Sequence, residues 1–167
     1  MPPTFVLRRA TPSDADAIAA AHVDSIRAIG PDFYPQHVVD AWAAGLTRDL
    51  YVRAMTDGEA FFVAVDPGDD QVVLGFSTHR TEPDEHRTAV YVRGSAARRG
   101  VGSALFHAAE ADVRASGGTS ITISASLAAV DFYTATGFAE TGRGEHRLRN
   151  GVMMACVFMC KTLAPVT

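Results

Sequence analysis

The sequence predicts a single α/β domain that spans residues 1–167 and is built on a mixed, mainly antiparallel sheet. Three observations support this fold class. The chain has 167 residues, of which 47% are hydrophobic and 20% charged, the size and balance of one compact domain. Strand-like and helix-like segments alternate along it, without a repeat or a long linker. One helical segment separates two strand segments that can then pair in parallel.

The first helix has clear start signals in the sequence. Residues 4–10 are predicted to form a strand, and Thr11 directly after it can cap a helix whose first position is Pro12. Apolar side chains then recur at helical spacing from Ile18 to Ile29, which gives the helix a face to bury.

The next segments predict a second helical region and a hairpin. Residues 36–56 are helical in pattern, and Gly45 can divide them into two pieces. A polar turn then joins two segments rich in β-branched and aromatic residues. This arrangement predicts an antiparallel hairpin of 60–66 with 72–80.

Residues 88–126 have the order strand, turn, helix, strand. Residues 88–92 form the first strand, and apolar residues at helical spacing predict a helix over 101–116 that ends at Gly117 and Gly118. The segment 119–126 is rich in β-branched residues and is predicted to be a strand. Because a helix connects the two strands, they can run parallel through a right-handed crossover.

The C-terminal part predicts a short helix and a final hairpin. The helix covers 128–136 and stops at Gly137. Strand segments 145–149 and 152–163 flank Asn150-Gly151, a dipeptide typical of two-residue hairpin turns. We expect the methionines of the last strand to fill the core. They are Met153, Met154 and Met159.

Composition and charge argue against several kinds of partner. Fifteen basic and nineteen acidic residues give a net charge of −4, which argues against a nucleic acid or an anionic membrane held by bulk charge. No apolar stretch is long enough to span a membrane, and the N-terminus lacks the order of a secretion signal, so we expect a cytoplasmic protein. The two cysteines, Cys156 and Cys160, and the six histidines show no metal-ligand spacing, and we expect no metal.

The stretch "AARRGVGSAL", residues 96–105, predicts an anion site. Glycines at 100 and 102 allow a ligand to approach the backbone N–H groups at a helix start, and Arg98 and Arg99 add positive charge. The turn lacks the Gly-Lys-Ser/Thr ending of a nucleoside triphosphatase loop. It also lacks the third glycine of a dinucleotide fingerprint, where Leu105 stands. A phosphate or pyrophosphate of another ligand is therefore the predicted partner.

Two segments resemble the GCN5-related N-acetyltransferase (GNAT) superfamily. Residues 97–102 resemble its acetyl-CoA-binding signature, Gln/Arg-x-x-Gly-x-Gly/Ala, with Ala97 in place of the leading Gln or Arg. Residues 126–138, "SLAAVDFYTATGF", resemble its downstream segment, with Ser126 where the family often has Asn. Together with the order of strands and helices, the resemblance covers roughly residues 4–163.

The resemblance implies a fold, a reaction and a set of site residues. It implies a GNAT-like sheet that is splayed at the cofactor site, with helices on both faces. It also implies an acetyl-CoA-dependent N-acetyltransferase in which a primary amine attacks the thioester directly in a ternary complex. Tyr133 takes the position of the proton donor to the departing thiolate. The residues placed at acetyl-CoA are Val90, Tyr91, Val92, Arg98, Arg99, Gly100, Val101, Gly102, Ser103 and Ser126.

Several points stay open at this stage. The family often places a carboxylate near the end of the central strand, where this chain has Arg87 and Thr88. The base that deprotonates the amine is therefore unassigned. Its candidates are Glu82, Glu85, His79, His86 or a water molecule. Ser126 is an equally good helix cap. A catalytically silent acyl-CoA-binding regulatory module of the same fold is the alternative function.

The acceptor is expected to be a small-molecule or peptide amine, and a homodimer through the C-terminal strands is possible on the same resemblance. Acceptor choice is expected in the first helices and the last hairpin. Aromatic and histidine candidates for the pocket wall are Phe33, Tyr34, His37 and Trp42. The hairpin carries a basic rim, which would favour an acceptor with a carboxylate or phosphate. That rim comprises Arg143, His146, Arg147 and Arg149.

Overall fold

The computed structural model describes residues 4–81 and 86–164. Within them, seven strands form one sheet in the order β1-β2-β3-β4-β5-β7-β6. All neighbours are antiparallel except β4 and β5, which confirms the mixed, mainly antiparallel sheet. The strands are β1 (Val6–Arg9), β2 (Ala60–Asp66), β3 (Asp69–Thr81), β4 (His86–Val92), β5 (Ser120–Ser126), β6 (Ala139–Arg147) and β7 (Met153–Thr162).

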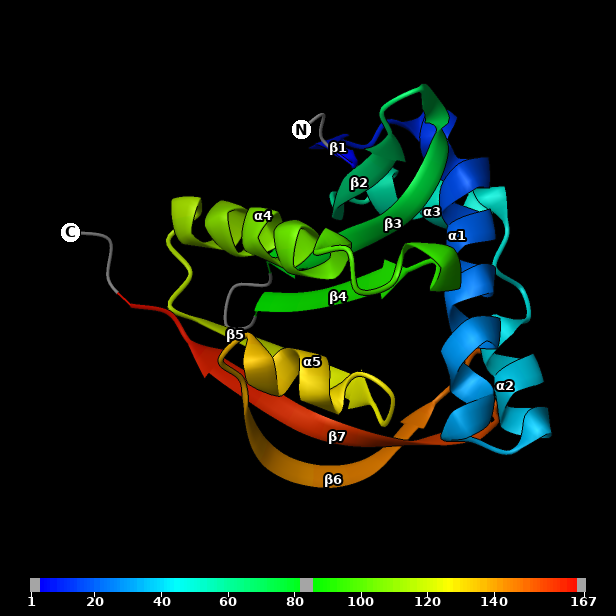
Figure 1. Ribbon diagram of the computed structural model, residues 1–167. Coiled ribbons are helices and arrows are strands. Elements are labelled where there is room, and N and C mark those ends of the chain that lie inside the picture. Colours follow the sequence, from blue (N-terminus) through cyan, green and yellow to red (C-terminus); the bar gives the residue numbers. More distant parts are fainter. Residues whose placement is uncertain (1–3, 82–85, 165–167) are drawn as a thin grey trace.

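Helices cover both faces of the sheet, as expected (Figure 1). Helices α1 and α3 pack on one face over Phe61, Val63 and Phe76, whereas α4 packs on the other over Ala64 and Leu74. The helices are α1 (Ala15–Ile29), α2 (Gln36–Ala43), α3 (Arg48–Thr56), α4 (Val101–Ala115) and α5 (Val130–Ala135). Single turns of 3-10 helix cover Pro12–Asp14, Gly30–Asp32 and Gly94–Ala96. The predicted break at Gly45 separates α2 from α3, and its φ of +75° is a left-handed conformation that glycine adopts readily.

The sheet opens between its two central strands. Among the described residues, β4 and β5 share a single registered pair, Arg87 with Thr122. Beyond this pair the two strands diverge toward their C-terminal ends, and the gap is visible between β4 and β5 in Figure 1. On its other side β4 remains paired with β3 from His86 to Val92, so the opening is local.

The connection from β4 to α4 is held against α1. The backbone N–H of Gly94 donates a hydrogen bond of 2.9 Å to the carboxylate of Asp24. A Cβ at Gly94 would lie 2.7 Å from the Cβ of Ala28, so the loop approaches the helix too closely for a side chain. Glycine is therefore required where this loop contacts α1.

The last hairpin differs from the sequence prediction in its turn. Instead of a two-residue turn, three residues lie between Leu148 and Val152, whose backbone groups form a hydrogen bond of 2.9 Å. Gly151 supplies the left-handed residue that such a loop needs, with φ of +87°. The side chain of Asn150 accepts a hydrogen bond of 3.3 Å from the N–H of Val152 within the loop and donates one of 3.1 Å to the carbonyl of Ala41 outside it, and both contacts stabilise the wider loop.

The strand after this turn buries two of its three methionines. Met154 and Met159 lie in the core, as predicted, but Met153 is 46% exposed and the prediction for it is wrong. Side chains alternate between faces along a strand, so Met153 and Met154 cannot both point into the same core. Apolar character alone did not identify which of the two faces inward.

A partly buried ion pair fixes the start of α1. Asp14 is buried and accepts two hydrogen bonds of 2.8 Å from the guanidinium of Arg8, and a third of 2.8 Å from the N–H of Thr11. The bonds from Arg8, together with that from Thr11, lower the pKa of Asp14 from its usual value of 3.8 despite burial. The pair ties β1 to the first helical turn.

We predict that Asp14→Asn lowers the free energy of unfolding at pH 7 by about 2 kcal/mol, because it removes charge-assisted hydrogen bonds. The pKa of the folded carboxyl lies below its unfolded value. The ionised group therefore stabilises the fold above pH 3.8 and loses this effect as the pH falls through the folded pKa. Urea unfolding at pH 7 and at decreasing acidic pH should show the gap between wild type and variant closing.

Asp16→Asn is the matched control for this prediction. Asp16 lies two residues further along, is 75% exposed and pairs with Arg48 at 3.4 Å, so its loss should change stability by less than about 0.5 kcal/mol. Equal effects of the two substitutions would contradict the role assigned to Asp14.

Candidate active site

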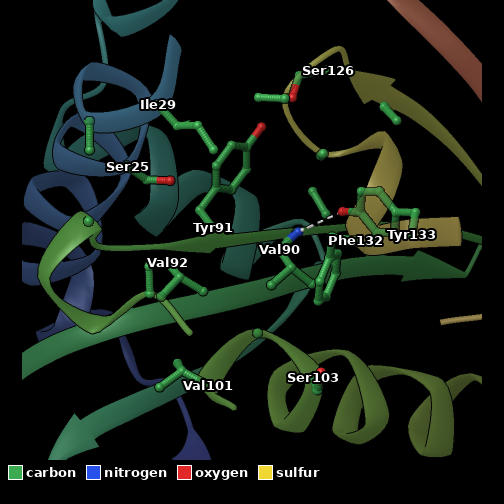
Figure 2. Close-up of a pocket in the computed structure, with 18 of the residues that line it drawn as sticks. Ser25, Ile29, Val90, Tyr91, Val92, Val101, Ser103, Ser126, Phe132 and Tyr133 are labelled. Carbon is green, nitrogen blue, oxygen red and sulfur yellow. Dashed lines mark hydrogen bonds between the residues drawn. The ribbon is translucent and has the colours of Figure 1, made fainter. Parts of the chain in front are cut away.

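A cavity of about 430 Å³ lies where the sheet opens. We call it the first cavity. It is bounded by β4, the turn before α4, the end of β5 and the start of α5 (Figure 2). The last turns of α1 close it with Ser25, Ala28 and Ile29. Most of its lining is apolar, and its polar side chains include Arg98 and Ser103 at the turn, Tyr133 and Ser126.

The turn before α4 presents its backbone N–H groups to the first cavity. Gly100 is the N-cap of α4 with φ of +80°, and Arg98 is also left-handed with φ of +61°. The first helical hydrogen bond runs from the N–H of Ala104 to the carbonyl of Gly100, so the amides before Ala104 have no acceptor within the helix. A Cβ at Gly102 would lie 3.2 Å from the ring of Phe132. These features form an anion site with bare amides at a helix N-terminus.

The two arginines of this turn point to different places. Arg98 lines the first cavity. The guanidinium of Arg99 instead donates a hydrogen bond of 2.8 Å to the carbonyl of Thr4, ahead of β1. Of the residues that the sequence places at acetyl-CoA, Arg99 alone does not line this cavity; the others do.

Tyr133 projects from α5 to the middle of the first cavity. Its hydroxyl accepts a hydrogen bond of 3.1 Å from the N–H of Val90, as Figure 2 shows. The side chain is buried, and burial raises its pKa above the usual value of 10. Tyr133 therefore keeps its proton at neutral pH and lies against a backbone donor of the opened strand.

Ser126 is not a helix cap. The N-cap of α5 is Ala129, whose N–H donates to the carbonyl of Ser126 at 3.0 Å, and the Ser126 hydroxyl makes no capping bond. Its side chain lies at the end of β5 beside the first cavity (Figure 2). The position is compatible with a ligand contact.

Two of the four side chains considered as the base, His79 and His86, are among the described residues, and the structure does not bring them to the first cavity. His79 is buried on the α4 face of the sheet, and its Nε2 lies 2.6 Å from a carboxylate oxygen of Asp112. His86 lies near Gly118, at the far end of β4 from the turn. Glu82 and Glu85 lie outside the described residues. Neither histidine lines the first cavity.

A second cavity of about 550 Å³ adjoins the first. The two share lining residues on β4, β5 and α2. These are Trp42, Thr88, Ala89, Tyr91, Ile123, Ser124 and Ser126. The second cavity extends from there between α1, α3 and the β6–β7 hairpin. Two cavities therefore meet at the opened strand.

His22 and Tyr51 form part of the wall of the second cavity, and sequence reasoning did not single them out. Nδ1 of His22 lies 2.8 Å from the hydroxyl of Tyr51, and its ring centroid lies 4.0 Å from that of Tyr91. Burial, with a smaller effect of the Arg149 charge, lowers the pKa of His22 to about 3, so the ring is neutral at physiological pH. No sequence signal links His22 with Tyr51, because 28 residues separate them. They meet only because α1 packs on α3.

Of the aromatic and histidine candidates for an acceptor wall, Trp42 lines both cavities. Tyr34 is a buried structural residue. Its hydroxyl donates to the carbonyl of Ala155 at 2.6 Å and accepts from the N–H of Leu127 at 2.8 Å. Phe33 and His37 are exposed on the surface and line neither cavity.

Two further features concern only residues 4–81 and 86–164. No helix there is long and apolar enough to cross a membrane. No three histidine, cysteine or acidic side chains gather there in a way that could hold a metal ion.

The fold and the turn match one known domain family. The family model of the acetyltransferase (GNAT) domain matches residues 29–161, most of the chain. The chain belongs to this family. No curated protein sequence matches it.

The similarity to solved structures of the same fold covers almost the whole chain. A protein of Rhodopseudomonas palustris, described as a GCN5-related N-acetyltransferase and class-II aminotransferase, is 30% identical with a TM-score of 0.84, covering 96% of each chain. The PaiA N-acetyltransferase of Thermoplasma acidophilum, in complex with coenzyme A, is 14% identical with a TM-score of 0.75 over 95% of this chain and 99% of its own. A Sinorhizobium meliloti phosphinothricin acetyltransferase, in complex with acetyl-CoA, is 19% identical with a TM-score of 0.68, covering 96% and 89%.

The different directions of the two arginines lead to a prediction. Arg98→Asn, which tolerates the left-handed backbone, should weaken binding of acetyl-CoA about 10-fold, because one charge-assisted contact is lost. Arg99→Asn should change it less than 2-fold, since its guanidinium is bound to Thr4. Isothermal titration at low and high salt measures both, and the Arg98 effect should shrink with added salt. A larger loss for the Arg99 variant would contradict this assignment.

Proposed function

We propose that the protein is an N-acetyltransferase that uses acetyl-CoA as donor and a primary amine as acceptor. One observation supports this proposal most directly. The first cavity combines an anion-binding turn at one end with the Val90 N–H and Tyr133 hydroxyl further in, and it meets a second cavity at the same strand. Two substrates can therefore reach one backbone segment from separate cavities.

The residues of the first cavity fit coenzyme A. The bare amides of the α4 turn and Arg98 suit a pyrophosphate, and the absence of a Cβ at Gly102 keeps the turn clear beside Phe132. On the side that faces β5, the backbone of Val90, Tyr91 and Val92 has no strand partner among the described residues. Apart from the Val90 N–H, which is bonded to Tyr133, its groups on that side can pair with the amide groups of a pantetheine arm. The apolar side chains of this part of the cavity suit the methylene groups of that arm.

The chain's own residues can carry out two of the steps that amine acetylation needs. Bound acetyl-CoA supplies an activated thioester, which an amine can attack without a covalent enzyme intermediate. The N–H of Val90 donates to the Tyr133 hydroxyl in this structure, and it would stabilise negative charge on a carbonyl oxygen once that bond is exchanged for one to the substrate. Tyr133, which keeps its proton because of burial, can donate it to a departing thiolate.

Deprotonation of the amine is proposed to need no dedicated carboxylate of the described residues. An amine whose pKa is lowered in the second cavity could lose its proton to water. A homodimer through the C-terminal strands stays a prediction, to be tested by the mass of the protein in solution.

The proposed function predicts loss of binding on Gly102→Glu. A carboxylate at this position should both fill the space beside Phe132 and repel a pyrophosphate. We expect acetyl-CoA affinity to fall more than 100-fold in a titration of the folded variant. Ala111→Glu places the same charge on an exposed position of α4 outside both cavities and should bind as wild type does.

Wild-type protein should then release free thiol from acetyl-CoA when a panel of primary amines is added. Binding without transfer to any amine would favour the catalytically silent module. Absence of binding by folded wild-type protein would overturn the use of acetyl-CoA altogether.

The role proposed for Tyr133 predicts a defect in turnover rather than in binding. Tyr133→Phe should lower kcat about 100-fold, because the leaving thiolate loses its proton donor, while the Kd of acetyl-CoA changes less than 3-fold. Since the pKa of Tyr133 is raised, wild-type kcat should not fall between pH 7 and 9.5 through loss of this proton. Steady-state kinetics over this range test both points.

Tyr34→Phe is the control for removal of a buried hydroxyl. Tyr34 bonds Leu127 and Ala155 and lines neither cavity, so its loss should lower thermal stability and leave kcat within 3-fold of wild type. An unchanged kcat in Tyr133→Phe would remove Tyr133 from the proton step.

A further inference from the structure

The charge of the second cavity is unevenly balanced. Among its described lining residues, Arg87, Arg147 and Arg149 are cationic, and Glu59 is the acidic one. Glu59 already accepts hydrogen bonds from the hydroxyl of Thr78 and from Nε of Arg80, the latter at 3.4 Å. Its charge is therefore already engaged within the protein. The cavity has excess positive charge.

Two of these cations have no counter-charge. Arg147 and Arg149 lie at the β6–β7 hairpin and form neither an ion pair nor a hydrogen bond with any residue that the structure describes. Arg143 of the same hairpin contrasts with them. Its guanidinium binds the carboxylate of Glu140 at 2.7 Å, and it lines neither cavity. Within the basic rim predicted from the sequence, the charge of Arg143 is thus neutralised, whereas the charges of Arg147 and Arg149 are not neutralised by any described residue.

The charge of Arg149 acts on the interior of the second cavity. Burial mainly lowers the pKa of His22, and the Arg149 charge lowers it further. Burial raises the pKa of Tyr51, and the same charge opposes that rise. His22 and Tyr51 belong to α1 and α3, on the wall across from the hairpin. The charge of the Arg149 guanidinium therefore reaches side chains inside the second cavity, although Arg149 itself is exposed to solvent.

The remainder of the second cavity is apolar. Aliphatic and aromatic side chains from α2, α3, β2, β3 and the hairpin surround the charged groups. They include Leu46, Leu50, Phe61, Phe76, Leu148 and Met154. Such a lining favours a small ligand with an apolar body and one anionic group, because guanidinium pairs with carboxylate or phosphonate through two parallel hydrogen bonds. A simple amine or polyamine would instead meet uncompensated positive charge.

From these observations we infer that the acceptor is a small primary amine that carries an anionic group, and that Arg149, assisted by Arg147, is the residue that selects it. This inference rests on the proposed acetyl transfer.

The test uses acceptors that share one phenyl body. They are phenylalanine, phenylalanine amide, phenethylamine and the phosphonate analogue of phenylalanine. The amide has lost the negative charge but keeps an acidified ammonium, so it separates anion recognition from amine pKa. Wild-type protein should show a kcat/KM at least 10-fold higher for the two anionic acceptors. The ratio between them distinguishes carboxylate from phosphonate as the preferred anion.

Variants of the hairpin then assign the selectivity. Arg149→Gln should lower kcat/KM for the anionic acceptors about 10- to 100-fold, mainly through KM, and leave the neutral amines within 3-fold. Arg149→Lys should restore part of this loss. Arg143→Gln, the matched control, should behave as wild type does, because Arg143 is already paired with Glu140.

The outcomes distinguish failure of the inference on acceptor selection from failure of the proposed acetyl transfer. Transfer to neutral amines as fast as to anionic ones, or an Arg149→Gln variant with unchanged selectivity, would overturn the inference and leave acetyl transfer standing. Bound acetyl-CoA with no transfer to any of the four acceptors, nor to any amine of a wider panel, would overturn the proposed function and the inference together.

Discussion

The site depends on the early end of pairing between β4 and β5. Arg87 with Thr122 is the single registered pair of these strands among the described residues, and the backbone of β4 from Val90 to Val92 lines the first cavity on that side. Backbone groups in a protein interior must find partners, so this opening is stable only because other groups satisfy it. In the structure the hydroxyl of Tyr133 accepts a hydrogen bond from the N–H of Val90. Both cavities, the turn of α4 and the position of α5 follow from this one interruption of the sheet.

The same interruption accounts for the pre-organisation of the site. The groups that would act on a substrate are fixed by elements outside the cavity. The N–H of Gly94 is bonded to Asp24 of α1, which places the turn, and the ring of Phe132 from α5 lies beside Gly102 at the start of α4. Little reorganisation is needed for donors that are already aligned, and such alignment is the main source of electrostatic catalysis in enzymes. Strain at Arg98, whose φ is +61°, is a local cost of this arrangement.

Much of the donor side of the site was predictable from sequence, whereas little of the acceptor side was. The turn at 96–105 needs particular residues at adjacent positions, and a left-handed Gly100 at a helix start leaves a local signal. The sequence does not predict that the side chains of Arg98 and Arg99 point to different places. Their directions depend on the left-handed backbone of Arg98 and on the position of the Thr4 carbonyl, which binds Arg99. His22, Tyr51 and Arg149 converge only through packing of α1, α3 and the last hairpin. Likewise, Met153 and Met154 differ in burial by strand parity alone.

The placement of the hairpin on β7 has an evolutionary consequence. Strand β7 pairs with β5 from Ser120 to Ser126, so the sheet carries the hairpin without any contribution from the turn of α4 or from Arg98. Residues at its tip, such as Arg147 and Arg149, are exposed and contribute no buried packing that the core requires. Under the proposed function, changes there would alter which amine is accepted while the turn of α4 keeps its sequence. The two ends of the site could thus diverge at different rates on one scaffold.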